Sequence, residues 1–230
     1  MSKPTRPKAI LFDWDNTLVN TWPAIHDANN HTLVAMGQAP WTYEETLLRV
    51  RRSMRDSFPE LFGDQWEKAA EIFYARFEES HIERLEAHEG AEKMLKALVS
   101  MGYYLGVVSN KTGKYLRQEV EHLGWGKYFK KVIGAGDAQL DKPNPAPVDL
   151  ALEDSGITRG KDVWFVGDTD VDLECAFNCK CIGVLIRSQA PMQGEFDDYP
   201  PSWYFNNCIE LAATLENCEV WEMDHVAKAL

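Results

Sequence analysis

Two aspartates, Asp13 and Asp15, are separated by a single residue and follow directly on an apolar run at residues 9–12. In an extended chain, alternate side chains point to the same side, so the two carboxylates face the same way. Carboxylates this close repel each other unless a cation or a shared proton lies between them. The pair therefore predicts a metal site or acid–base chemistry, although Asp-x-Asp also occurs in solvated turns.

A hydroxyl and an amide follow the second apolar run, residues 103–108. These are Ser109 and Asn110, and a helix is predicted to begin directly after them, over residues 111–123. The first turn of a helix has backbone N–H groups without intrahelical partners, and together with the helix dipole they favour an anion. The segment therefore predicts an anion site, with a simple helix cap as the alternative for Ser109.

An acidic cluster follows a further apolar run, residues 162–166. It contains Asp168 and Asp172 and opens another predicted helix, and Lys142 lies in the proline-rich segment that precedes it. Each feature alone has an ordinary explanation, as a helix cap, a surface lysine or a solvated acidic turn. Carboxylates, a hydroxyl and a lysine that all follow buried strands are hard to explain by packing.

The elements that position these residues alternate between apolar runs and amphipathic segments from residue 90 onward. Strands are predicted at residues 9–12, 103–108, 131–133, 162–166 and 181–186, with a short edge strand at 203–205 and a closing helix at 209–215. Strands separated by helices predict a doubly wound parallel sheet, a Rossmann-like α/β core. Open sheets of this kind bind ligands beyond the carboxyl ends of their strands.

Residues 21–88 interrupt this alternation and contain no convincing strand. Helices are predicted at residues 22–37, at 42–54, and from 64 or 65 to about 85. The last of these carries aromatic residues at helical spacing, which indicates core packing. The sequence therefore predicts an α/β catalytic core formed by residues 1–20 and 89–230, with a helical cap domain inserted after the first strand.

The composition is that of an ordinary folded protein, with 45% hydrophobic and 26% charged residues. A net charge of −12 argues against a nucleic acid or an anionic membrane as partner. No apolar run could cross a bilayer and no secretory segment follows the N-terminus, so a cytoplasmic location is expected. The five cysteines lack paired metal-ligand spacing, which favours buried thiols.

Four segments, taken in order, resemble the four motifs of the haloacid dehalogenase superfamily. They are the sequences at residues 13–17, 109–110, 142–143 and 167–172, and within the superfamily they are most similar to the phosphoglycolate phosphatase-like members. The first motif differs mildly, with Asn16 where many members carry Gly. The resemblance extends from about residue 8 to residue 187, and the helical block stands where this family inserts a small cap domain.

The resemblance implies a role for each motif residue. Asp13 would be the nucleophile that forms an aspartyl-phosphate, and Asp15 would protonate the leaving oxygen and then activate water. An Mg²⁺ site is implied, with ligands from Asp13, the backbone carbonyl of Asp15, Asp168 and, through water, Asp172. The phosphoryl oxygens would be bound by Ser109, the Asn110 backbone N–H and Lys142.

The expected function is Mg²⁺-dependent hydrolysis of a small phosphomonoester, either phosphoglycolate-like or a sugar phosphate. Dehalogenases proper lack an acid–base aspartate at the position of Asp15. A β-phosphoglucomutase-like phosphomutase stays open, because it shares the core residues and the cap position. A receiver-type phospho-aspartate signalling protein and a catalytically silent binding protein are weaker alternatives. The expected partner is a small phosphorylated metabolite, and the expected state is a monomer or a homodimer.

Three further residues are candidates for substrate binding. Thr17 belongs to the first motif, and Arg49 and Arg52 share a face of a predicted helix in the cap. The arginines could clamp a substrate carboxylate, or they could form a solvated or salt-bridged basic face.

Overall fold

The computed structural model describes residues 6–50 and 54–227, with side-chain surroundings for residues 6–50 and 57–217. It divides into two compact units, Asn20–Glu86 and the remainder of the chain, Met1–Val19 with Ala87–Leu230. Two short strands, β2 (Val19–Asn20) and β3 (Glu86–Ala87), pair with each other, and they contain the two boundaries between the units. The prediction of no strand in residues 21–88 is therefore wrong at β3, whose pairing with a distant segment leaves no local sequence signal.

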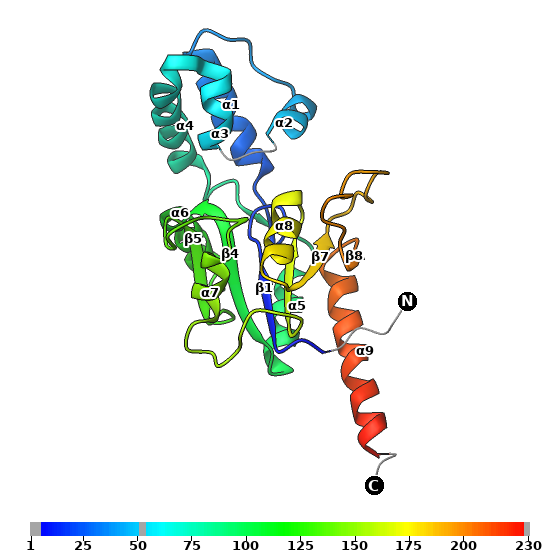
Figure 1. Cartoon of the computed structure of the whole chain (residues 1–230). Coiled ribbons are helices and arrows are strands. Elements are labelled where there is room, and N and C mark those ends of the chain that lie inside the picture. Colours follow the sequence, from blue (N-terminus) through cyan, green and yellow to red (C-terminus); the bar gives the residue numbers. More distant parts are fainter. Residues whose placement is uncertain (1–5, 51–53, 228–230) are drawn as a thin grey trace. The chain divides into compact units, whose positions relative to one another are not determined.

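The larger unit is built on a six-stranded sheet (Figure 1). Its strands are β1 (Ala9–Phe12), β4 (Tyr104–Thr112), β5 (Lys131–Ala135), β6 (Val163–Gly167), β7 (Ile182–Ile186) and β8 (Trp203–Phe205). They pair in parallel in the order β5-β4-β1-β6-β7-β8. The predicted doubly wound α/β fold is confirmed.

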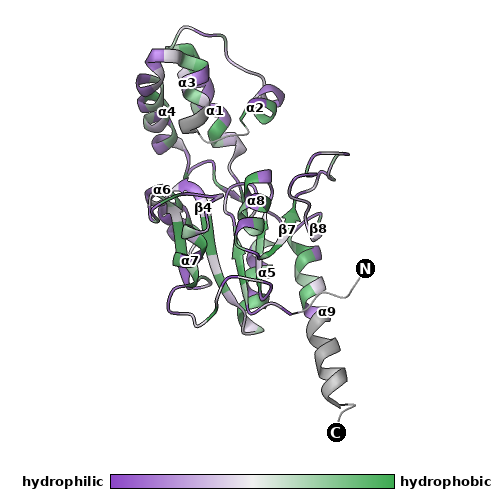
Figure 2. Ribbon diagram, in the orientation of Figure 1, coloured by the Kyte–Doolittle hydropathy of each residue, from purple (hydrophilic) through white to green (hydrophobic). Residues whose placement is uncertain are grey.

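Helices cover both faces of this sheet (Figure 1). α7 (Ala146–Leu152) and α8 (Asp170–Asn178) share one apolar cluster with strand residues, while α5 (Ala91–Ser100) packs against α9 (Cys208–Ala227). Because both faces are covered, the inner strands are apolar throughout, as the Ala9–Phe12 segment shows with every residue buried. Figure 2 shows hydrophobic ribbon in the sheet and hydrophilic ribbon in the loops.

Cysteine side chains are described at four positions. They are free thiols, three of them buried: Cys175, Cys179 and Cys208 are buried and Cys181 is half-buried. Cys218 lies outside the residues whose side chains are described. The expectation of buried thiols is confirmed for the three buried residues.

The boundary between β4 and the next helix differs from the prediction. The strand continues to Thr112, which pairs with Ala135 of β5 beyond an irregularity in the register, and α6 begins only at Gly113 and ends at His122. The helix predicted to begin at residue 111 is wrong by two residues. A side chain on Gly134 would overlap the backbone of Gly113, so the two segments approach closely at that point.

The smaller unit is helical. It contains α1 (Trp22–Ala35), α2 (Tyr43–Arg49), α3 (Met54–Phe62), the 3₁₀ turn η1 (Gly63–Gln65) and α4 (Trp66–Ser80). Phe58 of α3 packs against Phe73 of α4 at a ring distance of 5.7 Å, and Phe77 stacks on Phe73 at 5.8 Å. Phe73 and Phe77 of the aromatic stripe are therefore core, as predicted, whereas Tyr74 is 38% exposed. The single helix predicted over residues 42–54 is wrong, because α2 ends at Arg49 and a separate helix begins at Met54.

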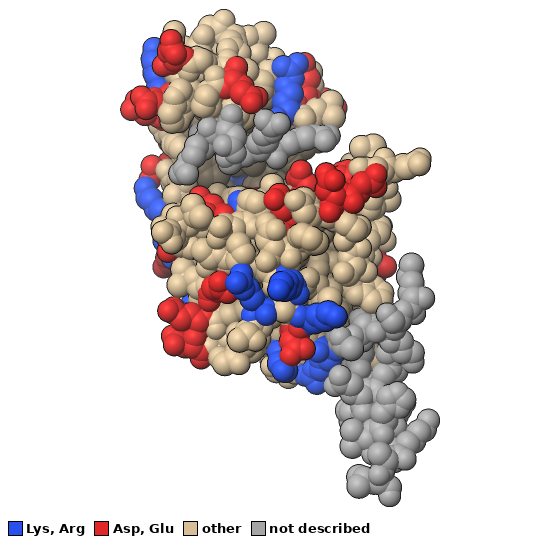
Figure 3. Space-filling model, in the orientation of Figure 1, with Lys and Arg blue, Asp and Glu red and all other residues tan. Residues whose placement is uncertain are grey.

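Acidic side chains gather over the loop between β7 and β8, where Asp197 and Asp198 are exposed (Figure 3). Such a surface repels polyanions and attracts cations. Within the part of the chain that is described, every helix is too short or too polar to pass through a bilayer.

Candidate active site

Asp13 lies at the carboxyl end of β1, in the middle of the sheet. Its backbone N–H donates a hydrogen bond of 2.8 Å to the carbonyl of Val166, so pairing with β6 continues one residue beyond the strand. The side chain is only 8% exposed, and its Oδ1 accepts a hydrogen bond of 2.7 Å from Lys142 Nζ. The sheet thus fixes the backbone of Asp13 while the lysine fixes its carboxylate.

Lys142 joins two carboxylates. Its Nζ donates to Asp172 Oδ1, also at 2.7 Å, and its side chain is 3% exposed. Burial alone would lower the pKa of Lys142, but the charges of Asp13 and Asp172 outweigh burial, so that its pKa lies above the usual value. The lysine is therefore a permanent cation in the floor of the site.

Negative charge still exceeds positive charge here. Burial raises the pKa of Asp13 from 3.8 to about 6, and the charges of Asp172 and Asp15 add to the rise while Lys142 opposes it. Burial, together with the charges of Asp172 and Asp13, also raises the pKa of Asp168 well above its usual value. A further cation among these carboxylates would relieve this repulsion.

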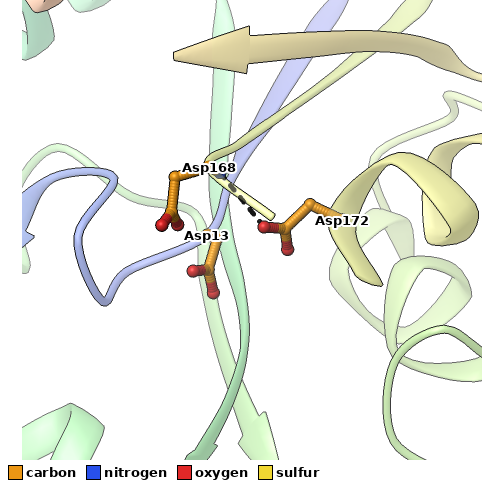
Figure 4. Close-up of side chains that lie close together, drawn as sticks. All are labelled: Asp13, Asp168 and Asp172. Atoms are coloured by element: carbon orange, nitrogen blue, oxygen red, sulfur yellow. Dashed lines mark hydrogen bonds between the residues drawn. The ribbon is translucent and has the colours of Figure 1, made fainter. Parts of the chain in front are cut away.

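Three carboxylates could hold such a cation. Asp13, Asp168 and Asp172 turn their carboxylates toward one another (Figure 4), each offering an oxygen within 4.8 Å of the others. An all-oxygen donor set of this kind suits a hard cation such as Mg²⁺. The residues present therefore fit a magnesium site.

Asp172 is the most constrained of the three. Its Oδ2 accepts hydrogen bonds from the backbone N–H groups of Asp168 and Thr169, at 3.1 and 3.0 Å, and from Thr169 Oγ1 at 2.8 Å. This capping box begins α8, and a Cβ on Gly167 would overlap the aspartate side chain. Both oxygens of Asp172 are engaged, which suits contact with a cation through water.

Thr17 and Asn110 hold site residues in place. Thr17 Oγ1 donates a hydrogen bond of 3.0 Å to Asp168 Oδ1. Asn110 Nδ2 donates to the carbonyl of Lys142 at 3.0 Å, and its Oδ1 accepts from the Lys142 backbone N–H at 2.9 Å. The amide thus fastens the lysine segment to β4, a role that could not be expected from the spacing of the residues.

Ser109 is buried and lies within β4, where its Oγ accepts a hydrogen bond of 3.2 Å from the Lys111 backbone N–H. The expectation that Ser109 and Asn110 directly precede a helix is wrong, because α6 begins at Gly113. Phosphate binding by these two residues stays a prediction.

Asp15 takes part in a second group of contacts, which sequence reasoning missed. Lys111 Nζ donates to Asp15 Oδ1 at 2.7 Å and to both oxygens of Glu119, at 2.8 and 2.7 Å. Trp14 Nε1 donates to Glu119 Oε2 at 2.7 Å. The available signal was Glu119 itself, a carboxylate on the same helix face as the apolar Leu116.

The cap arginines divide into one described and one undescribed residue. Arg49 is exposed, pairs with Glu45 at 3.2 Å and lies over the Trp41 ring at 5.0 Å, all within the smaller unit. This is the salt-bridged alternative of the sequence analysis. Arg52 lies outside the described residues.

A doubly wound sheet with a buried aspartate, a lysine and an acidic cluster at its carboxyl edge defines an α/β enzyme built for group transfer. The particular family follows from comparison. Residues 10–184 match the model of the haloacid dehalogenase-like hydrolase family, and the chain belongs to this family. The resemblance stated from the motifs is confirmed.

Known relatives agree with this assignment. A phosphoglycolate phosphatase of Xylella fastidiosa is 28% identical over 221 residues, covering 94% of each chain, and one of Rhodobacter capsulatus is 28% identical over 218 residues, covering 90% of this chain and 96% of its own. The structure of a predicted phosphoglycolate phosphatase from Haemophilus somnus superposes with a TM-score of 0.79 at 22% identity, covering 90% of this chain and 97% of its own. The predicted enzyme class, a phosphoric monoester hydrolase, is confirmed.

Proposed function

We propose that this phosphoric monoester hydrolase depends on Mg²⁺ and hydrolyses a small phosphorylated metabolite through a phosphoenzyme formed on Asp13. The observation that carries the proposal is the buried group formed by Asp13, Lys142 and the acidic cluster at one edge of the sheet. A carboxylate held this firmly is oriented for attack, and the lysine beside it offers positive charge to a phosphoryl group.

In the first step, an Asp13 oxygen attacks phosphorus and the bond to the leaving oxygen breaks. Asp15 gives its proton to that oxygen, and the alcohol departs. In the second step, Asp15 takes a proton from water, whose oxygen attacks the aspartyl-phosphate and releases inorganic phosphate with Asp13 restored. A magnesium ion held by Asp13, the Asp15 carbonyl and Asp168 would supply charge neutralisation for both steps.

The proposed phosphate ligands are Lys142, Ser109 and the Asn110 backbone N–H. Lys142 already contacts Asp13, so a phosphoryl group on Asp13 lies within its reach. The helical unit, Asn20–Glu86, is proposed to be the cap that selects the substrate. Relatives named phosphoglycolate phosphatase favour a small carboxylated phosphomonoester as the substrate class.

Turnover of p-nitrophenyl phosphate and 2-phosphoglycolate, with Mg²⁺ or with EDTA, tests the proposal. We expect Mg²⁺-dependent release of phosphate and a loss of about 10³-fold or more in Asp13→Asn, with acid-stable labelling of the wild type by ³²P-substrate. Asp162→Asn is the matched control, because Asp162 is an exposed aspartate paired with Lys8. Undiminished turnover by Asp13→Asn would refute the mechanism, and interconversion of sugar phosphates without phosphate release would indicate the phosphomutase.

A further inference from the structure

Glu119 is fully buried on a helix face that is otherwise apolar. It has 0% exposure, and the neighbouring Leu116 and Val120 on the same face of α6 are buried as well. A buried carboxylate loses its hydration, at a cost of several kcal/mol for each ion. Its oxygens are compensated by Lys111, which bonds both of them, and by the indole N–H of Trp14.

A buried ion pair is a poor way to stabilise a core. Replacing such a pair by apolar side chains of similar volume is often neutral or stabilising. The gain from Lys111 and Glu119 therefore has to lie in geometry. Burial would lower the pKa of Lys111, but the charges of Asp15 and Glu119 outweigh it, so the pKa is raised and the lysine keeps its charge.

The geometry leads to Asp15. Lys111 is 5% exposed and its Nζ holds Asp15 Oδ1 at 2.7 Å, whereas the Asp15 side chain is 25% exposed. A ligand can therefore reach the side chain of Asp15, whereas the side chain of Lys111 is buried and contacts the aspartate from the protein interior. Trp14, the residue between Asp13 and Asp15, is itself held edge-on against Trp125 at 5.7 Å.

We propose that Lys111 and Glu119 are positioning residues for Asp15. Glu119 orients the lysine, the lysine fixes one oxygen of Asp15, and the other oxygen is left directed to the leaving group and later to water. This inference rests on the proposed role of Asp15 in proton transfer. A misplacement of about 1 Å in such a group costs about 10²-fold in rate.

The main variant is Lys111→Met/Glu119→Leu, which removes both buried charges together, so that neither of the two is left buried without the other. For 2-phosphoglycolate we expect kcat to fall about 10–100-fold with KM changed less than about threefold. With p-nitrophenyl phosphate, whose leaving group departs without a proton, the variant should show a rapid burst of p-nitrophenol followed by slow turnover. Lys130→Met/Glu121→Leu, at exposed positions nearby, is the matched control and should behave as the wild type.

A defect in folding would slow both formation and hydrolysis of the phosphoenzyme, for both substrates. A burst with p-nitrophenyl phosphate therefore distinguishes the loss of positioning from a folding defect. Adding Lys111→Met/Glu119→Leu to Asp15→Asn should not lower the rate below that of Asp15→Asn alone, because both changes act through the same carboxylate. A rise in KM at unchanged kcat would assign Lys111 to substrate binding and overturn the proposal, as would equal slowing in the Asp15→Asn background. Full activity of Asp15→Asn would instead refute the proposed role of Asp15, and this inference with it.

Discussion

Lys142→Met removes the cation that lies between two buried carboxylates. In the folded protein Lys142 Nζ is 2.7 Å from both Asp13 Oδ1 and Asp172 Oδ1, and all three side chains are less than one-tenth exposed. Methionine has nearly the same length and fits the space, but it leaves both aspartates without their counter-ion. The substitution therefore tests charge compensation with little change in volume.

Lys142→Met should lower the free energy of unfolding by a large amount, because water cannot replace the buried lysine. Removing one partner of a buried ion pair costs about 3–5 kcal/mol, against a total stability of about 5–15 kcal/mol for a typical domain. Mg²⁺ at one hundred times Kd stabilises any form that binds it by about 2.7 kcal/mol, the wild type included. Because Lys142 competes with Mg²⁺ for Asp13 and Asp172, the variant should bind the ion more tightly and gain more from it, so the loss of stability should be greatest in EDTA.

The loss of stability caused by Lys142→Met should also depend on pH. The pKa of Asp13 is about 6 in the folded protein against an ordinary 3.8, so the folded state binds more protons than the unfolded state between these values. The free energy of unfolding therefore falls as pH rises through this window, by about 3 kcal/mol for this group without metal. Without the lysine the pKa rises further, so the variant should lose more stability at pH 7.5 than at pH 5.

Urea denaturation in EDTA and in Mg²⁺, at pH 5 and pH 7.5, measures these differences. The control is Lys8→Met, which breaks an equally short ion pair with Asp162, at 2.6 Å, whose side chains are 68% and 56% exposed. Exposed pairs contribute little, so the control should change far less. A loss below about 1 kcal/mol for Lys142→Met at pH 7.5 in EDTA, or a loss that does not vary with pH, contradicts the reasoning.

Three further outcomes follow from the site. Affinity for Mg²⁺, measured by calorimetry, should fall as pH drops below about 6, because protons compete for Asp13; a flat profile down to pH 5 would contradict this. Gly167→Ala should destabilise the protein by about 1–3 kcal/mol in urea, since its Cβ would overlap the capping carboxylate of α8, whereas Gly126→Ala, with open space around it, should not. Thr17→Val, which removes the hydrogen bond to Asp168, should weaken Mg²⁺ binding about 10-fold or more, and unchanged affinity would refute the role of that bond.

The sequence was most informative for elements whose structure depends only on their own residues. The apolar runs that became β1 and β6 are buried on both faces and end close to Asp13 and Asp168, so period and composition sufficed to place these aspartates at one sheet edge. The end of β4 was wrong because its last pairing, Thr112 with Ala135, depends on a strand elsewhere in the chain.

Contacts between side chains were the part that the sequence could not give. The amide of Asn110 fastens Lys142, which lies 32 positions further on, and the indole of Trp14 reaches Glu119 across 105 positions. Spacing along the chain carries no trace of such pairs. Only the chemical mismatch of a carboxylate on an apolar helix face pointed to one of them.

The structure shows how the repulsion between the two motif aspartates, Asp13 and Asp15, is offset. Among the described side chains, Asp13 has a lysine of its own, Lys142, and that lysine is held in turn by Asp172. The arrangement keeps the carboxylate buried, with side-chain exposure of 8%, and fixed. A carboxylate held in this way suits the nucleophilic role proposed for Asp13.

Asp15 has a separate group of contacts, in which Lys111 bonds the aspartate and Glu119 bonds the lysine. Its side chain is 25% exposed, against 8% for Asp13, so a substrate and water can reach Asp15 more readily. Two carboxylates one residue apart thus occupy different environments because two different lysines hold them. If Asp13 attacks and Asp15 transfers protons, as proposed, loss of Lys142 should impair the attack, whereas loss of Lys111 should impair proton transfer in both steps.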